Sequence, residues 1–197
     1  MSDEVDQGRR RLLTAATALT GAVGAVFVAT PFLASWKPSA RAKAMGAPIE
    51  IDISKLEPGS MLKVEWRGKP VWVVRRTPEM LKQLEKATPF LLDPASEGSV
   101  QPAYAKNDAR ALKPEYLVVL GVCTHLGCAP MPKFEVADVT VSADWPGGFY
   151  CPCHGSKFDL SGRVFKGVPA PSNLAVPPYT FVSDGRILVG ADSTQSA

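Results

Sequence analysis

Two six-residue stretches, Cys123-Thr-His-Leu-Gly-Cys128 and Cys151-Pro-Cys-His-Gly-Ser156, contain all four cysteines and both histidines of this 197-residue chain. Cysteine and histidine are typical ligands of soft and borderline metal ions. Because six such residues would not cluster in this way by chance, the sequence predicts that the two stretches, which we name box one and box two, form a single site. Each box offers one Cys/His pair and one additional cysteine.

The charge of the chain is distributed unevenly. The net charge is +3, but residues 48–197 carry 16 basic and 16 acidic side chains, so the excess comes from Lys37, Arg41 and Lys43. A neutral domain lacks the electrostatic footprint of nucleic-acid-binding proteins, and we exclude nucleic acid as a partner.

The N-terminal region has the pattern of a membrane anchor. Residues 12–36 contain no charged side chain. As an α-helix they would extend about 37 Å, enough to cross a hydrocarbon core of about 30 Å. Three arginines at positions 9–11 precede them, and such a positive flank favours the cytoplasm. The sequence therefore predicts a cytoplasmic N-terminus at residues 1–11 and a transmembrane anchor at residues 12–36.

Arg9 and Arg10, followed by Leu12 and Leu13, also resemble a twin-arginine export signal, which directs folded, cofactor-loaded proteins across the membrane. The alternative is that the arginines act only as a topology signal. Residues 37–47 are small and polar and predict a flexible or weakly helical tether. Small residues in the tether would also permit cleavage, but they lie beyond the apolar segment, so we favour a retained anchor.

Residues 48–197 are predicted to form a mainly β head. Thr77-Pro78-Glu79 is typical of a helix start, with a capping hydroxyl and proline at the first helical position. Arg67-Gly68-Lys69 is typical of a hairpin turn. The expected strands are residues 48–53, 61–66, 71–75 and 116–122, the last leading into box one, with a closing hairpin at residues 179–183 and 186–189.

The segment between the boxes contains an alternating pattern at Phe134–Ser142. Alternation of this kind predicts an additional surface hairpin or lobe, and a variable loop is the favoured alternative.

Three chemistries could use the boxes. Two disulfides would leave both histidines unexplained. Zinc ligand pairs are usually separated by two to four residues, whereas Cys123 and His125 are separated by one. The third possibility is a 2Fe-2S cluster with two cysteine and two histidine ligands.

Both boxes resemble the motifs of the Rieske iron–sulfur proteins letter for letter, and Gly167-Val-Pro-Ala-Pro171 is similar to the segment that follows box two in that family. The resemblance implies a Rieske-type antiparallel β-sandwich head with an inserted cluster-binding subdomain over approximately residues 116–171. It also implies one 2Fe-2S cluster. Its ligands would be Cys123 and Cys151 on one iron and His125 and His154 on the other, with a disulfide between Cys128 and Cys153.

The resemblance implies roles for further residues near the cluster. Ser156 would donate its hydroxyl to a bridging sulfide. Gly127 and Gly155 would let the loops turn and present backbone N–H groups to the sulfides. The family often has a tyrosine where this chain has Phe158, and one hydrogen bond fewer predicts a lower reduction potential. Imidazole ligands in place of two thiolates raise the potential and couple electron uptake to proton uptake.

The additional cysteine pair is typical of the membrane-bound quinol oxidoreductases of the family. The resemblance therefore implies the Rieske subunit of a bacterial quinol–cytochrome c oxidoreductase, with its head on the periplasmic side of the inner membrane. This subunit would accept one electron and a proton from ubiquinol at cytochrome b and deliver the electron to a c-type haem, which supports proton translocation. His154 would contact the quinol, together with His125.

The implied partners are a cytochrome b subunit, a c-type cytochrome subunit and ubiquinol, within a dimeric multi-subunit complex. Three alternatives remain open from the sequence. One is the Rieske subunit of a periplasmic molybdenum oxidase of the arsenite oxidase type, and another is a membrane-tethered, non-redox domain that binds a metal or is held by disulfides. The third is the plastoquinol-oxidising complex of photosynthesis, whose Rieske protein has the same boxes and which only the partner subunits distinguish.

Overall fold

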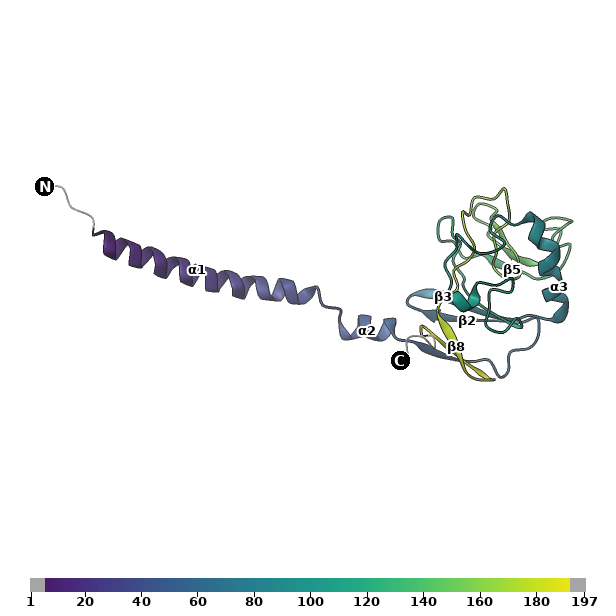
Figure 1. The fold of residues 1–197 in the computed structure, drawn as a ribbon, viewed down its shortest axis with the longest axis horizontal. Helices are drawn as coiled ribbons and strands as arrows, with labels where there is room; N and C mark the ends of the chain where they lie inside the picture. The colour runs from purple at the N-terminus through teal and green to yellow at the C-terminus, as the bar shows by residue number, and fades with distance from the viewer. Residues whose placement is uncertain (1–5, 192–197) are drawn as a thin grey trace. The chain divides into compact units, whose positions relative to one another are not determined.

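The computed structural model describes residues 6–191, which belong to two compact units divided after Ala44. The N-terminal unit contains helix α1 (Gln7–Ser35) and most of helix α2 (Ala40–Gly46). The second unit is the head, which contains the strands (Figure 1).

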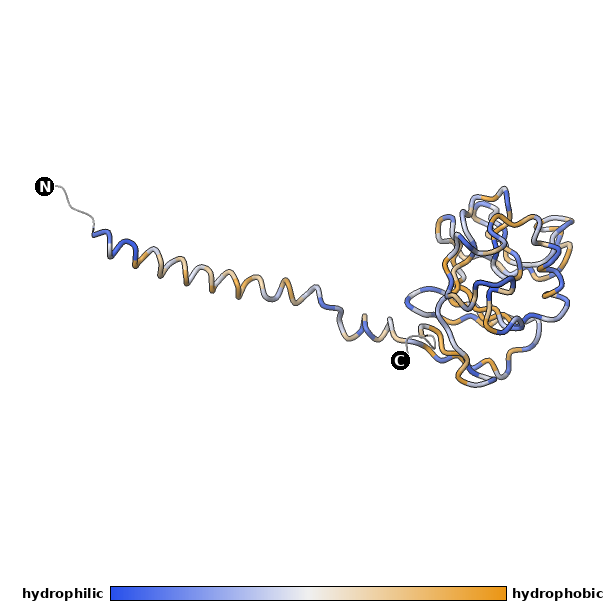
Figure 2. The backbone as a smooth tube through the Cα atoms, in the orientation of Figure 1, coloured by the Kyte–Doolittle hydropathy of each residue, from blue (hydrophilic) through white to orange (hydrophobic). Residues whose placement is uncertain are grey.

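Helix α1 begins at a cap and then remains apolar. The Asp6 carboxylate accepts the backbone N–H groups of Gly8 and Arg9, which have no partner inside the helix. Figure 2 shows a hydrophilic first turn followed by a largely apolar helix. The 29 residues extend about 44 Å, and none of their side chains is buried. The helix is therefore long and apolar enough to cross a membrane.

Helix α2 lies in the predicted tether. The Ser39 hydroxyl accepts the N–H of Ala42, which caps its first turn. At its other end the backbone is bound to the head, because Trp66 Nε1 donates to the carbonyl of Ala47 (3.0 Å) and Arg67 Nε donates to that of Gly46 (3.2 Å). The last residues of the predicted tether therefore belong to the head.

Within the described residues, the head has three antiparallel sheets of three strands each. The prediction of a mainly β protein is confirmed. The first sheet has the order β1 (Ile49–Asp52), β9 (Arg186–Val189), β8 (Tyr179–Ser183); the second β2 (Met61–Trp66), β3 (Lys69–Arg75), β4 (Tyr116–Leu120); and the third β5 (Met131–Lys133), β6 (Gly148–Tyr150), β7 (Lys157–Phe158).

Local sequence signals are confirmed at the turn between β2 and β3 and at the start of helix α3. Arg67 and Gly68 connect β2 to β3 with positive φ angles of 52° and 69°, the twist that suits a two-residue hairpin. Thr77 caps helix α3 (Pro78–Ala87), and its hydroxyl accepts the N–H of Met80. Two short 3-10 helices, η1 (Thr88–Phe90) and η2 (Ala103–Ala105), follow.

The third sheet is inserted between β4 and β8 and carries the boxes. Box one follows β4, and box two connects β6 to β7. The ring of Trp72 on β3 stacks on Phe149 on β6 with 5.1 Å between centroids, so the second and third sheets share one apolar core. This shared core fixes the position of both boxes.

A buried ion pair also holds the third sheet in place. Arg163 and Asp159 are fully buried in the turn that follows β7, with 2.7 Å between Arg163 Nε and Asp159 Oδ2. Arg163 Nη2 donates to the carbonyl of Leu84 on α3, and Arg76 Nη1 donates to the carbonyl of Leu160. A buried ion pair is stable only when its polar atoms are hydrogen-bonded, so the pair of Arg163 and Asp159 favours one arrangement of α3 and the turn. The bond from Arg76 links the same turn to the residue that follows β3.

Phe134–Ser142 is a loop with turns and not a hairpin, as the loop alternative predicts. The Asp138 carboxylate accepts the N–H and hydroxyl of Thr140, and Ala137 has a φ of 58°, both of which interrupt a strand. The loop returns to the sheet through Trp145, whose buried ring donates Nε1–H to the carbonyl of Lys133 at the end of β5.

Gly121, two residues before box one, tests the shared core. A Cβ atom at Gly121 would overlap the ring of Trp72, which cannot move because it is buried against Phe149. We expect Gly121→Ala to lower the free energy of unfolding by about 1–3 kcal/mol, the usual range for overpacking. Thermal unfolding followed by near-UV circular dichroism measures this loss.

Gly98→Ala is the matched control. Its Cβ would meet only Asp93 Oδ2 at 3.8 Å, an ordinary contact, and its φ is not in the left-handed region. Equal unfolding temperatures for the two variants would contradict the role given to Trp72.

Candidate metal centre

The two boxes form loops with the same backbone geometry. In box one the N–H of Cys123 donates to the carbonyl of Cys128 (2.7 Å), and the N–H of Gly127 donates to the carbonyl of Cys123 (3.0 Å). The equivalent residues of box two make the same pair of bonds at 2.8 and 2.9 Å. Each box is therefore a closed turn that holds its side chains in a fixed relation.

The fifth residue of each box must be glycine. Gly127 and Gly155 have φ angles of 84° and 76°, in the left-handed region that side chains disfavour. Their N–H groups, however, donate to the carbonyls of Cys123 and Cys151. These bonds close the two turns, which is the role of plain turn glycines, and the bonds from these N–H groups to the sulfides stay a prediction.

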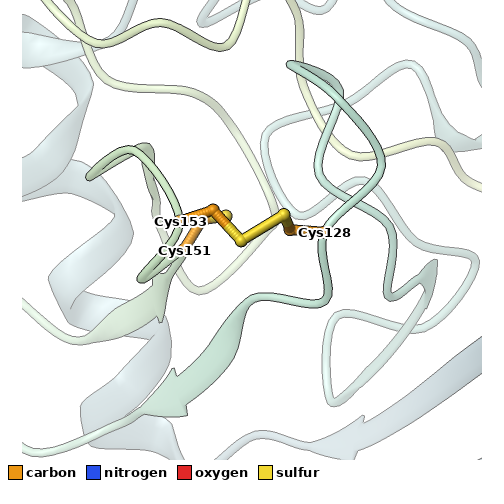
Figure 3. Close-up of side chains that lie close together, drawn as sticks. All are labelled: Cys128, Cys151 and Cys153. Atoms are coloured by element: carbon orange, nitrogen blue, oxygen red, sulfur yellow. A yellow bond between two sulfur atoms is a disulfide. The ribbon is translucent and has the colours of Figure 1, made fainter.

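A disulfide between Cys128 and Cys153 joins the two boxes, the pairing that the family resemblance implied. Figure 3 shows it beside Cys151, and the three sulfur atoms lie within 4.8 Å of one another. Sulfur atoms in a disulfide have no thiolate to offer a metal ion, so these three cysteines are not themselves a metal site. The thiols available as ligands are those of Cys151 and Cys123.

Cys123 and Cys151 are free and buried. Burial raises the pKa of the Cys151 thiol, and its hydrogen bond with Cys123 raises it further. The backbone N–H groups of Cys153 and His154 act in the opposite direction, since they favour the thiolate. Metal binding would release the thiol protons and leave these two N–H groups directed at the ligand sulfur.

The two imidazoles lie side by side near the thiol-bearing loops. The rings of His125 and His154 are 4.7 Å apart between centroids and nearly perpendicular. His125 Nδ1 is buried and has no hydrogen-bond partner among the described residues, whereas the side chain of His154 is exposed. A buried ring nitrogen without a partner is costly, and a metal ion would satisfy it.

Two thiols and two imidazoles on a pair of linked loops fit the ligand set of a 2Fe-2S centre in which histidines replace two cysteines. The structure brings the thiols of Cys123 and Cys151 together and the rings of His125 and His154 together, and their joint role as the four ligands stays a prediction. Their assignment to individual iron atoms remains a prediction.

A third segment, at residues 167–172, is bound to both boxes. The buried Ser156 Oγ accepts the N–H of Ala170 (3.1 Å), which leaves the hydroxyl proton of Ser156 free to donate, as predicted for a bond to sulfide. Thr124 Oγ1 donates to the carbonyl of Ser172 (2.6 Å). The sequence did not point to Thr124, because its partner is a backbone atom 48 residues away.

These observations define the class of a mainly β iron–sulfur protein with two Cys/His loops joined by a disulfide. Residues 49–179 match the family described as "Rieske [2Fe-2S] domain", and residues 1–39 match "Ubiquitinol-cytochrome C reductase Fe-S subunit TAT signal". The chain belongs to the Rieske [2Fe-2S] domain family. The predicted family, the predicted 2Fe-2S cofactor and the twin-arginine signal are thereby confirmed.

Curated relatives cover almost the whole chain. The "Ubiquinol-cytochrome c reductase iron-sulfur subunit" of Allochromatium vinosum is 58% identical over 95% of this chain and 91% of its own length. The proteins of the same name from Blastochloris viridis and Bradyrhizobium diazoefficiens are 44% and 41% identical. They cover 96% and 92% of this chain, and 97% and 94% of their own lengths.

Ser156→Ala tests the hydroxyl donor. Loss of one hydrogen bond worth about 1–1.5 kcal/mol should lower the midpoint potential of the cluster by about 40–65 mV for a one-electron couple. Voltammetry of the purified protein measures the shift. Ser172→Ala is the control, because only the backbone carbonyl of Ser172 bonds Thr124. A shift of the midpoint potential in Ser172→Ala but none in Ser156→Ala would contradict the role of the Ser156 hydroxyl as a donor to the cluster.

Phe158→Tyr tests the opposite change. Phe158 is buried in β7, and a hydroxyl that bonds a ligand sulfur should raise the midpoint potential by about 40–65 mV. Phe149→Tyr is the control, because Phe149 is equally buried and directly opposite on β6. An unchanged midpoint in Phe158→Tyr, or equal shifts in both variants, would contradict the prediction.

Proposed function

We propose that this protein is the iron–sulfur subunit of a ubiquinol–cytochrome c reductase. It accepts one electron and a proton from ubiquinol at cytochrome b and delivers the electron to the haem of a c-type cytochrome subunit. The observation that carries the proposal is the pair of disulfide-linked loops with two buried thiols and two adjacent imidazoles, of which one is exposed. The name and identity of the curated relatives support it.

The residues of the site have different roles in this proposal. When bound, the 2Fe-2S cluster supplies a one-electron acceptor whose oxidation state alters the proton affinity of its imidazole ligands. Cys123 and Cys151 hold the cluster from the buried side, where water is excluded. His154 is exposed, so its ring can accept a hydrogen bond from a quinol hydroxyl and then take the proton. Leu126, with 72% of its surface exposed, adds apolar contact area beside His125.

The N-terminal unit serves as the anchor in this proposal. Helix α1 crosses the bacterial inner membrane with the arginine-rich end in the cytoplasm, and the twin-arginine signal exports the folded head to the periplasm. Residues 37–47 are the tether on which the head moves between its partners. Because Gly46 and Ala47 are bound to the head, the movement would occur before Gly46. The partners are a cytochrome b and a c-type cytochrome subunit in a dimeric complex.

Electron paramagnetic resonance and co-purification test the function. Reduction with ascorbate should give the signal of a reduced 2Fe-2S cluster, and the protein should co-purify from detergent-solubilised membranes with b- and c-type haem subunits. A silent spectrum with bound zinc would refute redox function. Co-purification with a molybdenum subunit in place of the haem subunits would favour the arsenite oxidase type.

A further inference from the structure

A groove of about 860 Å³ lies on the head beside box two. Its walls come from helix α3 and the residues after it, from the loop between β5 and β6, and from the segment at residues 165–168. Gly155 of box two lines the groove, but His154 does not. The groove therefore lies beside box two without including the exposed imidazole.

The groove presents apolar side chains that the fold leaves uncovered. Phe90 and Val136 come from different segments and both line it, with 64% and 57% of their surfaces exposed. Beside them lie the rings of Trp145 and Phe165, 5.7 Å apart between centroids. Exposed apolar side chains around a hollow lined by aromatic rings indicate a place for an apolar group of another molecule.

The charge of the groove is positive although the head as a whole is neutral. Lys86, Lys157 and Lys166 line it, against a single carboxylate from Asp144. Lys166 Nζ donates to the carbonyl of Pro89 (3.1 Å). Among the described residues, Lys86 and Lys157 have no ion-pair partner. This local excess favours a negatively charged occupant.

We propose that the groove docks an acidic segment of a neighbouring protein subunit. An aliphatic or aromatic side chain of that segment lies between Phe90 and Val136, and its carboxylates face the lysines. The lysines stand on three different segments, which suits several carboxylates along a peptide better than one lipid headgroup. Gln83 and Ser142 also line the groove and can bond the amides of a peptide backbone. The proposal rests on the proposed membership in a multi-subunit complex.

Photo-crosslinking in native membranes tests the docking. The variant Val136→p-benzoylphenylalanine places the probe at the groove, and Val182→p-benzoylphenylalanine is the control, because Val182 is equally exposed (56%) but lies on β8. After irradiation, the crosslinked peptides are identified by mass spectrometry. We expect position 136 to give a product with a segment of another subunit that is rich in Asp and Glu, and position 182 to give none.

Charge reversal in the same experiment tests the lysines. Lys86→Glu, combined with the probe at position 136, should lower the yield of the product by about two- to fivefold. Lys82→Glu should leave the yield unchanged, because Lys82 is exposed on the same helix but does not line the groove. High salt should lower the yield in the wild-type background.

The docking proposal is overturned by a product with lipid only, by equal yields at positions 136 and 182, or by a product that Lys86→Glu does not affect. Because crosslinking takes place before purification, it reports on whichever neighbour is present. Co-purification with b- and c-type haems decides the proposed function separately. An acidic partner in a complex without haem would support the docking surface and refute the proposed function.

Discussion

The disulfide between Cys128 and Cys153 is the constraint on which the site depends. Each box closes on itself through two backbone hydrogen bonds, but nothing in that local geometry fixes one box relative to the other. The disulfide joins residues 25 positions apart and so makes one site from two turns. It also divides the four cysteines by role, because only Cys123 and Cys151 keep thiols that can bind a metal.

The disulfide can form only because the rest of the head brings the boxes together. The stacking of Trp72 on Phe149 places the third sheet against the second, and the buried pair of Arg163 and Asp159 fixes the turn after β7. Apolar burial supplies most of the stabilisation in such a core, whereas a paired buried charge chiefly excludes other arrangements. The two kinds of contact therefore have complementary effects on the position of box two.

The site has a buried side and an exposed side, and this difference suits electron transfer between two partners. The thiols lie in the core, where water is excluded, and His154 faces solvent. A partner can therefore meet a ring nitrogen without reaching the sulfur atoms. The positively charged groove beside box two does not include His154. A partner bound in the groove would therefore leave the exposed imidazole of His154 accessible for electron and proton transfer.

The sequence by itself determined the two boxes, the apolar N-terminal helix and the elements with local signals, such as the cap at Thr77 and the turn at Arg67-Gly68. These features depend on residues close in the chain. Only the tertiary structure decided where the N–H of Gly127 donates, that Thr124 bonds the carbonyl of Ser172, and that the segment anchored by Trp145 is a loop rather than a hairpin. Each of these depends on contacts that a local sequence pattern does not encode. Such a pattern specifies the type of each side chain, whereas its partner comes from a distant part of the fold.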